Sequence, residues 1–305
     1  MAISLTNHQY GKAETHLVRI VRDTARHEIR DLNVSTALRG PFDEAYLTGD
    51  QSLVLPTDTQ KNTAYAFAKK HGVASPEAYG VTLARHFVDD VAPVVGARVE
   101  IEEFTWQRAV IEGVEHTHTW TRTGPEVRTA AITVEPGEAG ETVTHVIGGL
   151  KDFIILKSTG SEFHDFLVDE YTTLQPTTDR VMATSLTAKW RVDPAAVDSV
   201  DWEALYPGVK AVMIREFATL QSLALQQTLW HMGKAVLETF PELVEIHLVA
   251  PNKHHFVVDL APFGLENNNE VFHADDRPYG LIEATIARDD APDAGSSWRH
   301  SAGLA

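Results

Sequence analysis

The chain reads Leu156-Lys157-Ser158-Thr159-Gly160-Ser161-Glu162-Phe163, continues through Tyr171-Thr172-Thr173-Leu174 and reaches Arg180. This stretch places an aromatic ring, Phe163, and a permanent cation, Arg180, seventeen positions apart on either side of a predicted loop. An aromatic face can stack on a flat ring, and a guanidinium is a planar fork of hydrogen-bond donors. The pattern therefore favours a flat, anionic ligand that forms hydrogen bonds.

Strands and helices are predicted on both sides of this stretch, in the same order twice. In the first half we expect strands over residues 16–22, 26–38 and 99–110, a hairpin of residues 117–122 and 127–134 around Thr123-Gly124-Pro125, and helices that open near Thr57 and at Ser75-Pro76-Glu77. In the second half we expect strands over residues 146–157, 181–192, 245–250, 255–260 and 281–287, and helices over 201–217 and 224–239. Long strands with segregated helices indicate an α+β fold of antiparallel sheets rather than a doubly wound α/β fold.

A length of 305 residues suits two domains, since domains usually run to about 100–200 residues. The turn residues from Glu135 to Gly140 are the best candidate for a boundary, so we expect modules over residues 1–138 and 139–305. The polar tail from Asp289 to Ala305 is expected to be loosely ordered.

Composition narrows the class of protein. The net charge is −17 and the basic residues are scattered, which argues against a nucleic-acid partner. No apolar run reaches the ~18 residues of a membrane span, and the N-terminus does not resemble a signal peptide. With no cysteine there are no disulfides and no thiolate chemistry, which fits a cytoplasmic protein. Neither the dinucleotide motif nor the phosphate-loop motif occurs.

Several side chains could carry chemistry, and each also has an ordinary explanation. Arg180 could grip a ligand edge or pair on the surface with Asp179 or Glu170. Gln226 could donate and accept on a heterocycle edge or lie on a helix surface. Phe163 could stack on a ligand or belong to the core.

A proton relay of Lys12, Thr57 and His254 is chemically possible, although nothing in their spacing brings them together. His116 and His118 would share one face of a strand, but no third ligand is suggested nearby, so we predict no metal site. A serine hydrolase is not supported, because the G-x-S-x-G motif is missing.

Three segments together resemble the urate oxidase (uricase) family. These are the stretch from Leu156 to Arg180, the segment Pro56-Thr57-Asp58, and the segment Pro251-Asn252-Lys253-His254, within a likeness that runs from Tyr10-Gly11-Lys12 to Thr285. The resemblance implies two tandem tunnelling-fold (T-fold) modules, with antiparallel sheets and helices on one face, that oligomerise into a barrel-shaped tunnel. It further implies a homotetramer with active sites at subunit interfaces.

The same resemblance implies oxidation of urate by O₂ and water to 5-hydroxyisourate and hydrogen peroxide, without metal, flavin or other cofactor. By analogy, Arg180 and Gln226 grip the urate edge, Phe163 stacks on the ring, and the backbone N–H groups of Asp58 and Leu225 complete the edge contacts. Lys12, Thr57 and His254 resemble the proton relay, and Asn252 resembles the residue that holds oxygen or water over the ring.

The sequence departs from the uricase pattern at two places, and two other functions remain as alternatives to urate oxidation. Pro176 is unusual and could shift the loop before Arg180, and the C-terminal Gly303-Leu304-Ala305 is not a peroxisomal signal, which favours a bacterial cytoplasmic protein. The alternatives are another tunnelling-fold enzyme that acts on purines or pterins, and a non-catalytic urate-binding protein.

Overall fold

The computed structural model describes residues 3–137 and 139–299. Close contacts divide the chain into two compact units. The first comprises residues 1–149, 190–206 and 290–305, and the second comprises residues 150–189 and 207–289. The strands β5 (Thr142–Lys157) and β6 (Met182–Val192) contribute residues to both units.

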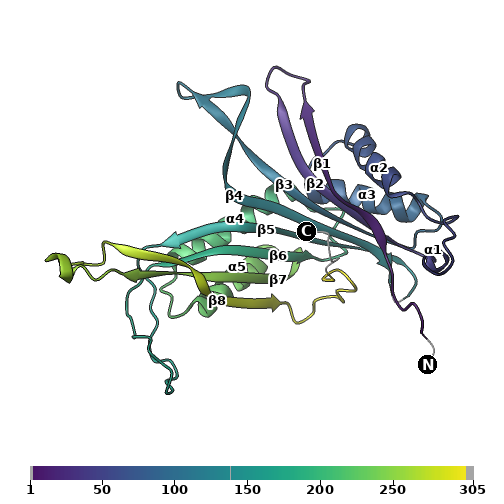
Figure 1. Cartoon of the computed structure of the whole chain (residues 1–305). Helices are drawn as coiled ribbons and strands as arrows, with labels where there is room; N and C mark the ends of the chain where they lie inside the picture. The colour runs from purple at the N-terminus through teal and green to yellow at the C-terminus, as the bar shows by residue number, and fades with distance from the viewer. Residues whose placement is uncertain (1–2, 138, 300–305) are drawn as a thin grey trace. The chain divides into compact units, whose positions relative to one another are not determined.

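The first unit is built on four antiparallel strands that neighbour one another in chain order. They are β1 (Tyr10–Val21), β2 (Glu28–Arg39), β3 (Gly96–Ile111) and β4 (Val114–Pro136). The helices α2 (Thr57–Lys70) and α3 (Pro76–Asp90) pack against this sheet, and a short helix, α1 (Asp43–Leu47), follows β2 (Figure 1). Leu32, Ile101 and Ile132 of the strands are buried with Leu83 and Phe87 of α3.

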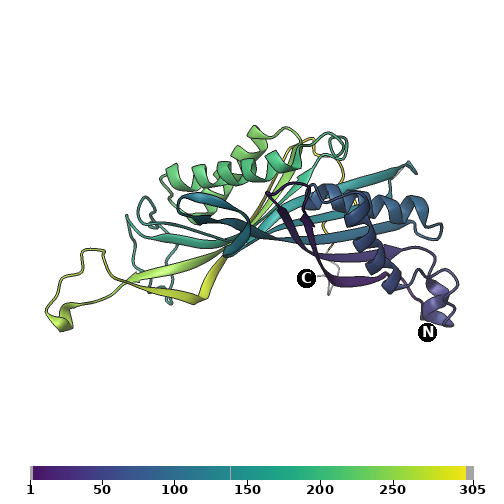
Figure 2. The same cartoon turned by 90° about the horizontal axis from the view of Figure 1, so that it is seen from above.

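The second unit repeats this plan with the later parts of the chain. Its strands are residues 150–157 of β5, residues 182–189 of β6, β7 (Leu243–Val257) and β8 (Phe272–Ala287). Residues 207–219 of α4 (Trp202–Thr219) and α5 (Leu225–Thr239) lie along one face of these strands, and the turn η1 (Ala261–Phe263) joins β7 to β8 (Figure 2). The prediction of an α+β fold is therefore confirmed.

One close approach recurs in both units. In α3, a Cβ added to Gly80 would lie 2.3 Å from Ile132 of β4, and in α5, one added to Gly233 would lie 2.6 Å from Ile286 of β8. Real Cβ atoms essentially never make contacts below 3.0 Å, so a larger residue at either position would force the isoleucine side chain to move. In both units the second of the two long helices meets the fourth strand, which supports the interpretation of the chain as two repeated modules.

The start of α3 agrees with prediction, because local capping chemistry decides it. Ser75 accepts a hydrogen bond from the backbone N–H of Ala78 at 3.0 Å, and Pro76 occupies the first turn of α3. The short elements α1 and η1 were not predicted.

The predicted hairpin around Thr123-Gly124-Pro125 is wrong. The chain reverses instead at Glu112 and Gly113, which both have positive φ, and β4 runs unbroken from Val114 to Pro136. A register shift between the pairs Phe104↔Val127 and Trp106↔Arg122 accommodates the extra residues. The two strands predicted over 245–250 and 255–260 are likewise one strand, β7.

The polar tail is more ordered than predicted as far as the structure describes it. Ser296 and Ser297 are buried, the Ser296 hydroxyl donates to Glu135 at 2.6 Å, and Arg98 donates to the Ser297 carbonyl at 2.8 Å. Residues 300–305 lie outside the described part of the chain, as does residue 138 at the predicted module boundary.

A buried ionic network ties α3 to the sheet of the first unit. Arg128 of β4 donates to both carboxylate oxygens of Glu77, at 3.1 and 2.7 Å, and to Glu203 at 2.8 Å. Glu77 is only 2% exposed. Burial raises the pKa of the Glu77 carboxyl, and the charge of Arg128 opposes that shift.

We expect Arg128→Met to lower the free energy of unfolding by about 3–5 kcal/mol, because it leaves the Glu77 carboxylate buried without its partner. The matched control is Arg26→Met, since Arg26 pairs with Glu115 on the surface, where both side chains are more than half exposed. Such a pair contributes about 0–1 kcal/mol. Chemical denaturation at a fixed protein concentration measures both changes, and equal losses would contradict the assignment.

Candidate functional site

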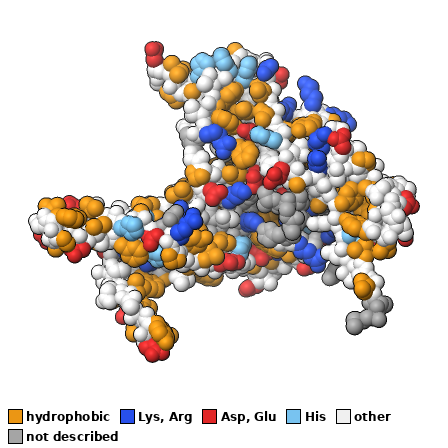
Figure 3. Space-filling view, in the orientation of Figure 1, with side chains coloured by type: hydrophobic (Ala, Val, Ile, Leu, Met, Phe, Trp, Pro, Cys, Tyr) orange, Lys and Arg blue, Asp and Glu red, His pale blue; other side chains and the backbone are white. Residues whose placement is uncertain are grey.

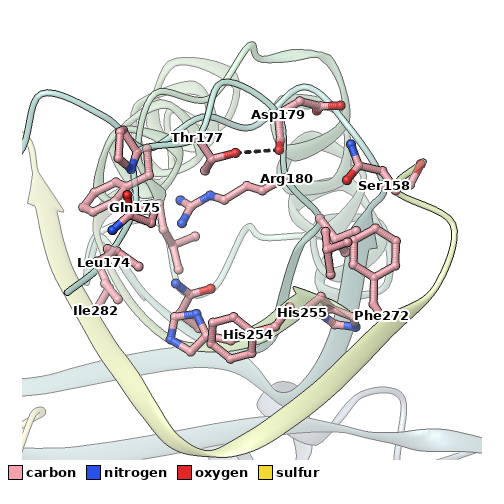
Figure 4. A pocket seen from close by; sticks show the side chains of 18 of the residues that line it. Ser158, Leu174, Gln175, Thr177, Asp179, Arg180, His254, His255, Phe272 and Ile282 are labelled. Atoms are coloured by element: carbon pink, nitrogen blue, oxygen red, sulfur yellow. Dashed lines mark hydrogen bonds between the residues drawn. The ribbon is translucent and has the colours of Figure 1, made fainter. Parts of the chain in front are cut away.

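The second unit contains a cavity of about 700 Å³. Every site residue that was predicted in the second half of the sequence lines it. Its wall includes the six predicted residues Phe163, Arg180, Leu225, Gln226, Asn252 and His254. They come from the β5–β6 connection, the start of α5 and the middle of β7. Segments far apart in the sequence therefore meet around one space (Figure 4).

Arg180 extends into this cavity and has an unusual set of partners (Figure 4). Its Nε donates to the hydroxyl of Ser161 at 3.2 Å, and its guanidinium carbon lies 5.1 Å from the centre of the Phe163 ring. The expected surface partner, Asp179, instead accepts from the Thr159 hydroxyl at 2.8 Å. Burial lowers the pKa of Arg180, and none of the described carboxylates pairs with it. A guanidinium stays protonated in proteins, so the cavity holds an uncompensated cation.

Phe163 is held at the cavity wall by backbone bonds on both sides of the loop. Its N–H donates to the Thr177 carbonyl at 2.8 Å, and the N–H of Thr177 donates back at 2.9 Å. The Phe163 ring stacks on Phe166 with a centroid distance of 5.2 Å. The ring is half-buried and lines the cavity, which excludes an ordinary core phenylalanine. Pro176 lies within this bonded loop and also lines the cavity.

The first turn of α5 presents backbone donors to the same space. Ala224 precedes the helix and has no side-chain oxygen to cap it. Leu225 is buried, whereas the side chain of Gln226 is exposed, and both residues line the cavity. Because the N-terminal N–H groups of a helix attract anions, an uncapped start opposite a guanidinium forms a place for a polar, electron-rich edge.

The strand β7 supplies the opposite wall at an irregular point. Its pairing with β8 shifts register between Asn252 and His254, which face Gly280 and Asp275. Such irregularities re-aim side chains and are common beside active sites. The pKa of His254 is lowered mainly by burial and secondarily by the charge of Arg180, while Asp275 opposes the shift. His254 is therefore a neutral imidazole near pH 7, able to take or give a proton.

Lys12, Thr57 and Asp58 belong to the first unit. Thr57 is the first residue of α2 and lines a separate cavity of about 580 Å³, together with Tyr10 and Phe42. Asp58 follows Thr57, and its carboxylate is bound by Lys61, which lowers its pKa. Like α5, α2 begins without a side-chain cap, so both backbone N–H groups predicted to hold a ligand, those of Asp58 and Leu225, lie in uncapped first turns.

Several side chains of the second-unit cavity, and one that supports α2 in the first unit, were not predicted from the sequence. Gln60 is fully buried, accepts from the Thr36 hydroxyl at 2.7 Å, and thereby ties α2 to the strand that pairs with Lys12. Ile282 could have been found from the alternation of β8. Gln175 and Thr177 were also missed, and they lie in the β5–β6 connection, where no periodic signal exists. His255 of β7 and Phe272 of β8 were missed as well, although both lie in paired strands.

Histidines gather at the far end of the β3–β4 hairpin (Figure 3). The rings of His116 and His118 lie 4.5 Å apart, and His27 lies 5.8 Å from His118. Within residues 3–137 and 139–299, however, no group of three or more histidine or acidic side chains is placed to hold a metal ion. None of the helices in the same residues is long and apolar enough to cross a membrane.

Comparison with known proteins gives a consistent result. The model of the family described as Uricase matches residues 8–133 and 146–283. The uricase of Arthrobacter globiformis is 48% identical over 99% of this chain and 96% of its own length, and that of Schizosaccharomyces pombe is 34% identical over 92% and 96%.

Solved structures extend the comparison to the fold. The crystal structure of the Arthrobacter globiformis uricase superimposes with a TM-score of 0.88 and covers 96% of this chain and 98% of that one. A urate oxidase mutant from Bacillus sp. TB-90 is only 20% identical yet reaches a TM-score of 0.81 over 93% of this chain, which shows that the fold is shared.

The lowered pKa of His254 leads to a prediction. In an NMR titration, His254 should gain its proton at lower pH than an ordinary exposed histidine, and Arg180→Ala should move its pKa back up, because a neighbouring cation is removed. Since the folded state then binds this proton less readily than the unfolded state, the contribution of His254 to stability should fall as pH drops below about 6.5. A His254 pKa that is unchanged by Arg180→Ala would contradict the electrostatic contact.

Proposed function

Because the chain belongs to the uricase family, we propose a role for each residue of its cavities in the oxidation of urate. The enzyme is an oxidoreductase that uses O₂, and its two tandem modules have the tunnelling fold of that family. Urate, O₂ and water yield 5-hydroxyisourate and hydrogen peroxide. We place the module boundary between residues 138 and 139, which is supported by the separate family matches over 8–133 and 146–283.

The uncompensated charge of Arg180 is the observation that carries the proposed substrate grip. Urate is anionic at neutral pH, and the chain has a net charge of −17, so the overall field opposes its approach. Arg180 and the uncapped start of α5 offset this locally. The guanidinium fork and the Gln226 amide bind the polar edge of the ring, the N–H groups of Leu225 and Asp58 add contacts, and Phe163 packs against the ring plane.

In the proposed mechanism, the main task of the protein is to move protons to and from urate. A urate dianion is electron-rich enough to reduce O₂ itself, so the proposal includes no metal or organic cofactor. Lys12, Thr57 and His254 form the relay that removes and returns protons, and the neutral His254 imidazole suits either direction. Asn252, at the register shift of β7, holds oxygen or water over the ring.

Each active site is proposed to lie between two subunits of a homotetramer. The division of the predicted residues supports this, since Lys12, Thr57 and Asp58 line or flank the cavity of the first unit and the other six line the cavity of the second. A closed symmetric assembly repeatedly joins unlike surfaces of identical chains. A cytoplasmic location is part of the same proposal, and similarity to a bacterial uricase supports it.

Reaction stoichiometry tests the activity and the absence of a cofactor together. In a chelated sample freed of small molecules, each urate lost from the absorbance spectrum should consume one O₂ and release one hydrogen peroxide. Urate binding without oxygen consumption would indicate the non-catalytic alternative. Turnover that vanishes when a stoichiometric bound metal is removed would refute the cofactor-free mechanism.

Mixing two inactive variants tests the shared site. We expect Lys12→Met and Arg180→Ala to be nearly inactive alone and to regain activity when they are refolded together, because some sites then receive both intact halves. Random pairing of equal amounts restores roughly a quarter of the sites. The matched control combines Lys12→Met with Thr57→Ala, whose lesions fall in the same half, so this mixture should stay inactive.

Hybrid assembly must be shown by a mass tag on one variant. If hybrids form and the first mixture also stays inactive, each site is built within one chain and the shared-site proposal is wrong.

A further inference from the structure

A buried chain of hydroxyl groups and one sulfur lies behind the cavity of the second unit. Ser161, Ser222 and Thr228 are fully buried, and Met182 is 1% exposed. The hydroxyls of Ser161 and Ser222 both approach the Met182 sulfur, at 3.6 and 3.8 Å, and the Ser222 hydroxyl lies 2.8 Å from that of Thr228. Polar groups this deeply buried are costly unless they are bonded, so the arrangement is a defined part of the fold.

Arg180 lies at one end of this chain. Its Nε donates to the Ser161 hydroxyl at 3.2 Å, which leaves the hydroxyl hydrogen free to point at the Met182 sulfur, a weak acceptor. Among the residues that the structure describes, this is the one hydrogen bond that the Arg180 side chain makes. Both terminal nitrogens of the guanidinium remain available, and the rotation of the group depends on the Ser161 oxygen.

The start of α5 lies at the other end. The Ser222 hydroxyl donates to the carbonyl of Ala224 at 3.0 Å, directly before Leu225 and Gln226. Backbone bonds join the same segments, since the N–H of Ser222 donates to Gly160 at 3.0 Å and the N–H of Arg180 donates to Ser161 at 2.9 Å. The two groups that hold the substrate edge are therefore fixed to one buried frame.

We infer that Ser161 is a positioning residue, which sets the guanidinium plane of Arg180 relative to the first turn of α5. This inference rests on the proposed grip of Arg180 on urate. A bidentate contact needs both terminal nitrogens in the plane of the ligand edge, and an error of about 1 Å in such a contact can cost ~10²-fold. The Ser161 hydroxyl itself does not touch the substrate.

The test is a double-mutant cycle of Ser161→Ala and Arg180→Ala in the full-length enzyme. Ser161→Ala should raise KM for urate and the Kd for xanthine, an analogue with the same pyrimidine edge, by roughly 10-fold, the usual range for a bond to a charged group. The kcat value should change by less than about threefold, because the proton relay is untouched. In the Arg180→Ala background, Ser161→Ala should add no further change.

Thr184→Val is the matched control. Thr184 lies two residues after Met182 in β6, is buried, and its hydroxyl has no partner among the described residues. Removing this hydroxyl should leave KM and the xanthine Kd unchanged. If Ser161→Ala does not assemble, Ser161→Cys replaces it, since the thiol is similar in size but a much weaker acceptor.

The outcomes separate the inference from the proposal on which it depends. If Arg180→Ala weakens binding and Ser161→Ala weakens it equally in both backgrounds, the grip stands and the positioning role is overturned. If Ser161→Ala lowers kcat and thermal stability while KM stays unchanged, its role is structural and the inference is also overturned. An unchanged xanthine Kd in Arg180→Ala would refute the grip, and the positioning role with it.

Discussion

The enzyme depends on one half-buried cation, Arg180, that has no carboxylate partner among the described residues. Arg180 is desolvated, and its pKa is lowered for that reason, yet the guanidinium remains charged. Removing a charge from water without a partner costs free energy, and an anionic ligand bound at Arg180 would offset that cost. In a chain of net charge −17, this local arrangement makes the cavity suitable for an anion. The bonds around Ser161, Phe163 and Thr177 hold that charge in place.

The same constraint explains why irregular backbone surrounds the site. Regular strands present side chains alternately to the two faces of a sheet, so a strand alone brings few groups to one point. In this enzyme the β5–β6 loop, the uncapped start of α5 and the register shift of β7 supply the groups instead. The regular elements form the rigid frame, and the close glycine contacts of Gly80 and Gly233 hold a helix against each sheet.

The two repeated units contribute different groups to the proposed active site. Each unit has an uncapped helix start beside a cavity, α2 with Thr57 in the first and α5 with Leu225 in the second. Helix N-termini attract anions, so the repeated plan provides two surfaces of similar electrostatic character. In the proposed assembly one surface contributes the grip and the other contributes the relay residues Lys12 and Thr57. The proposed assembly would make subunit association a condition for activity.

The sequence by itself determined the family, the α+β class and the candidate residues, because short motifs and local capping at Ser75-Pro76 depend on neighbours along the chain. It could not distinguish Arg180 in a cavity from Arg180 on the surface, since burial arises from contacts between distant segments. The missed continuity of β4 and β7 has the same origin. Thr123-Gly124-Pro125 disfavours a strand locally, but pairing of Arg122 and Val127 with β3 on either side carries β4 past it. Pro251 is itself paired with β8, which overrides its local preference. Only the tertiary structure placed Ser161, Met182 and Ser222 behind Arg180, because bonds between side chains distant in sequence leave no periodic pattern.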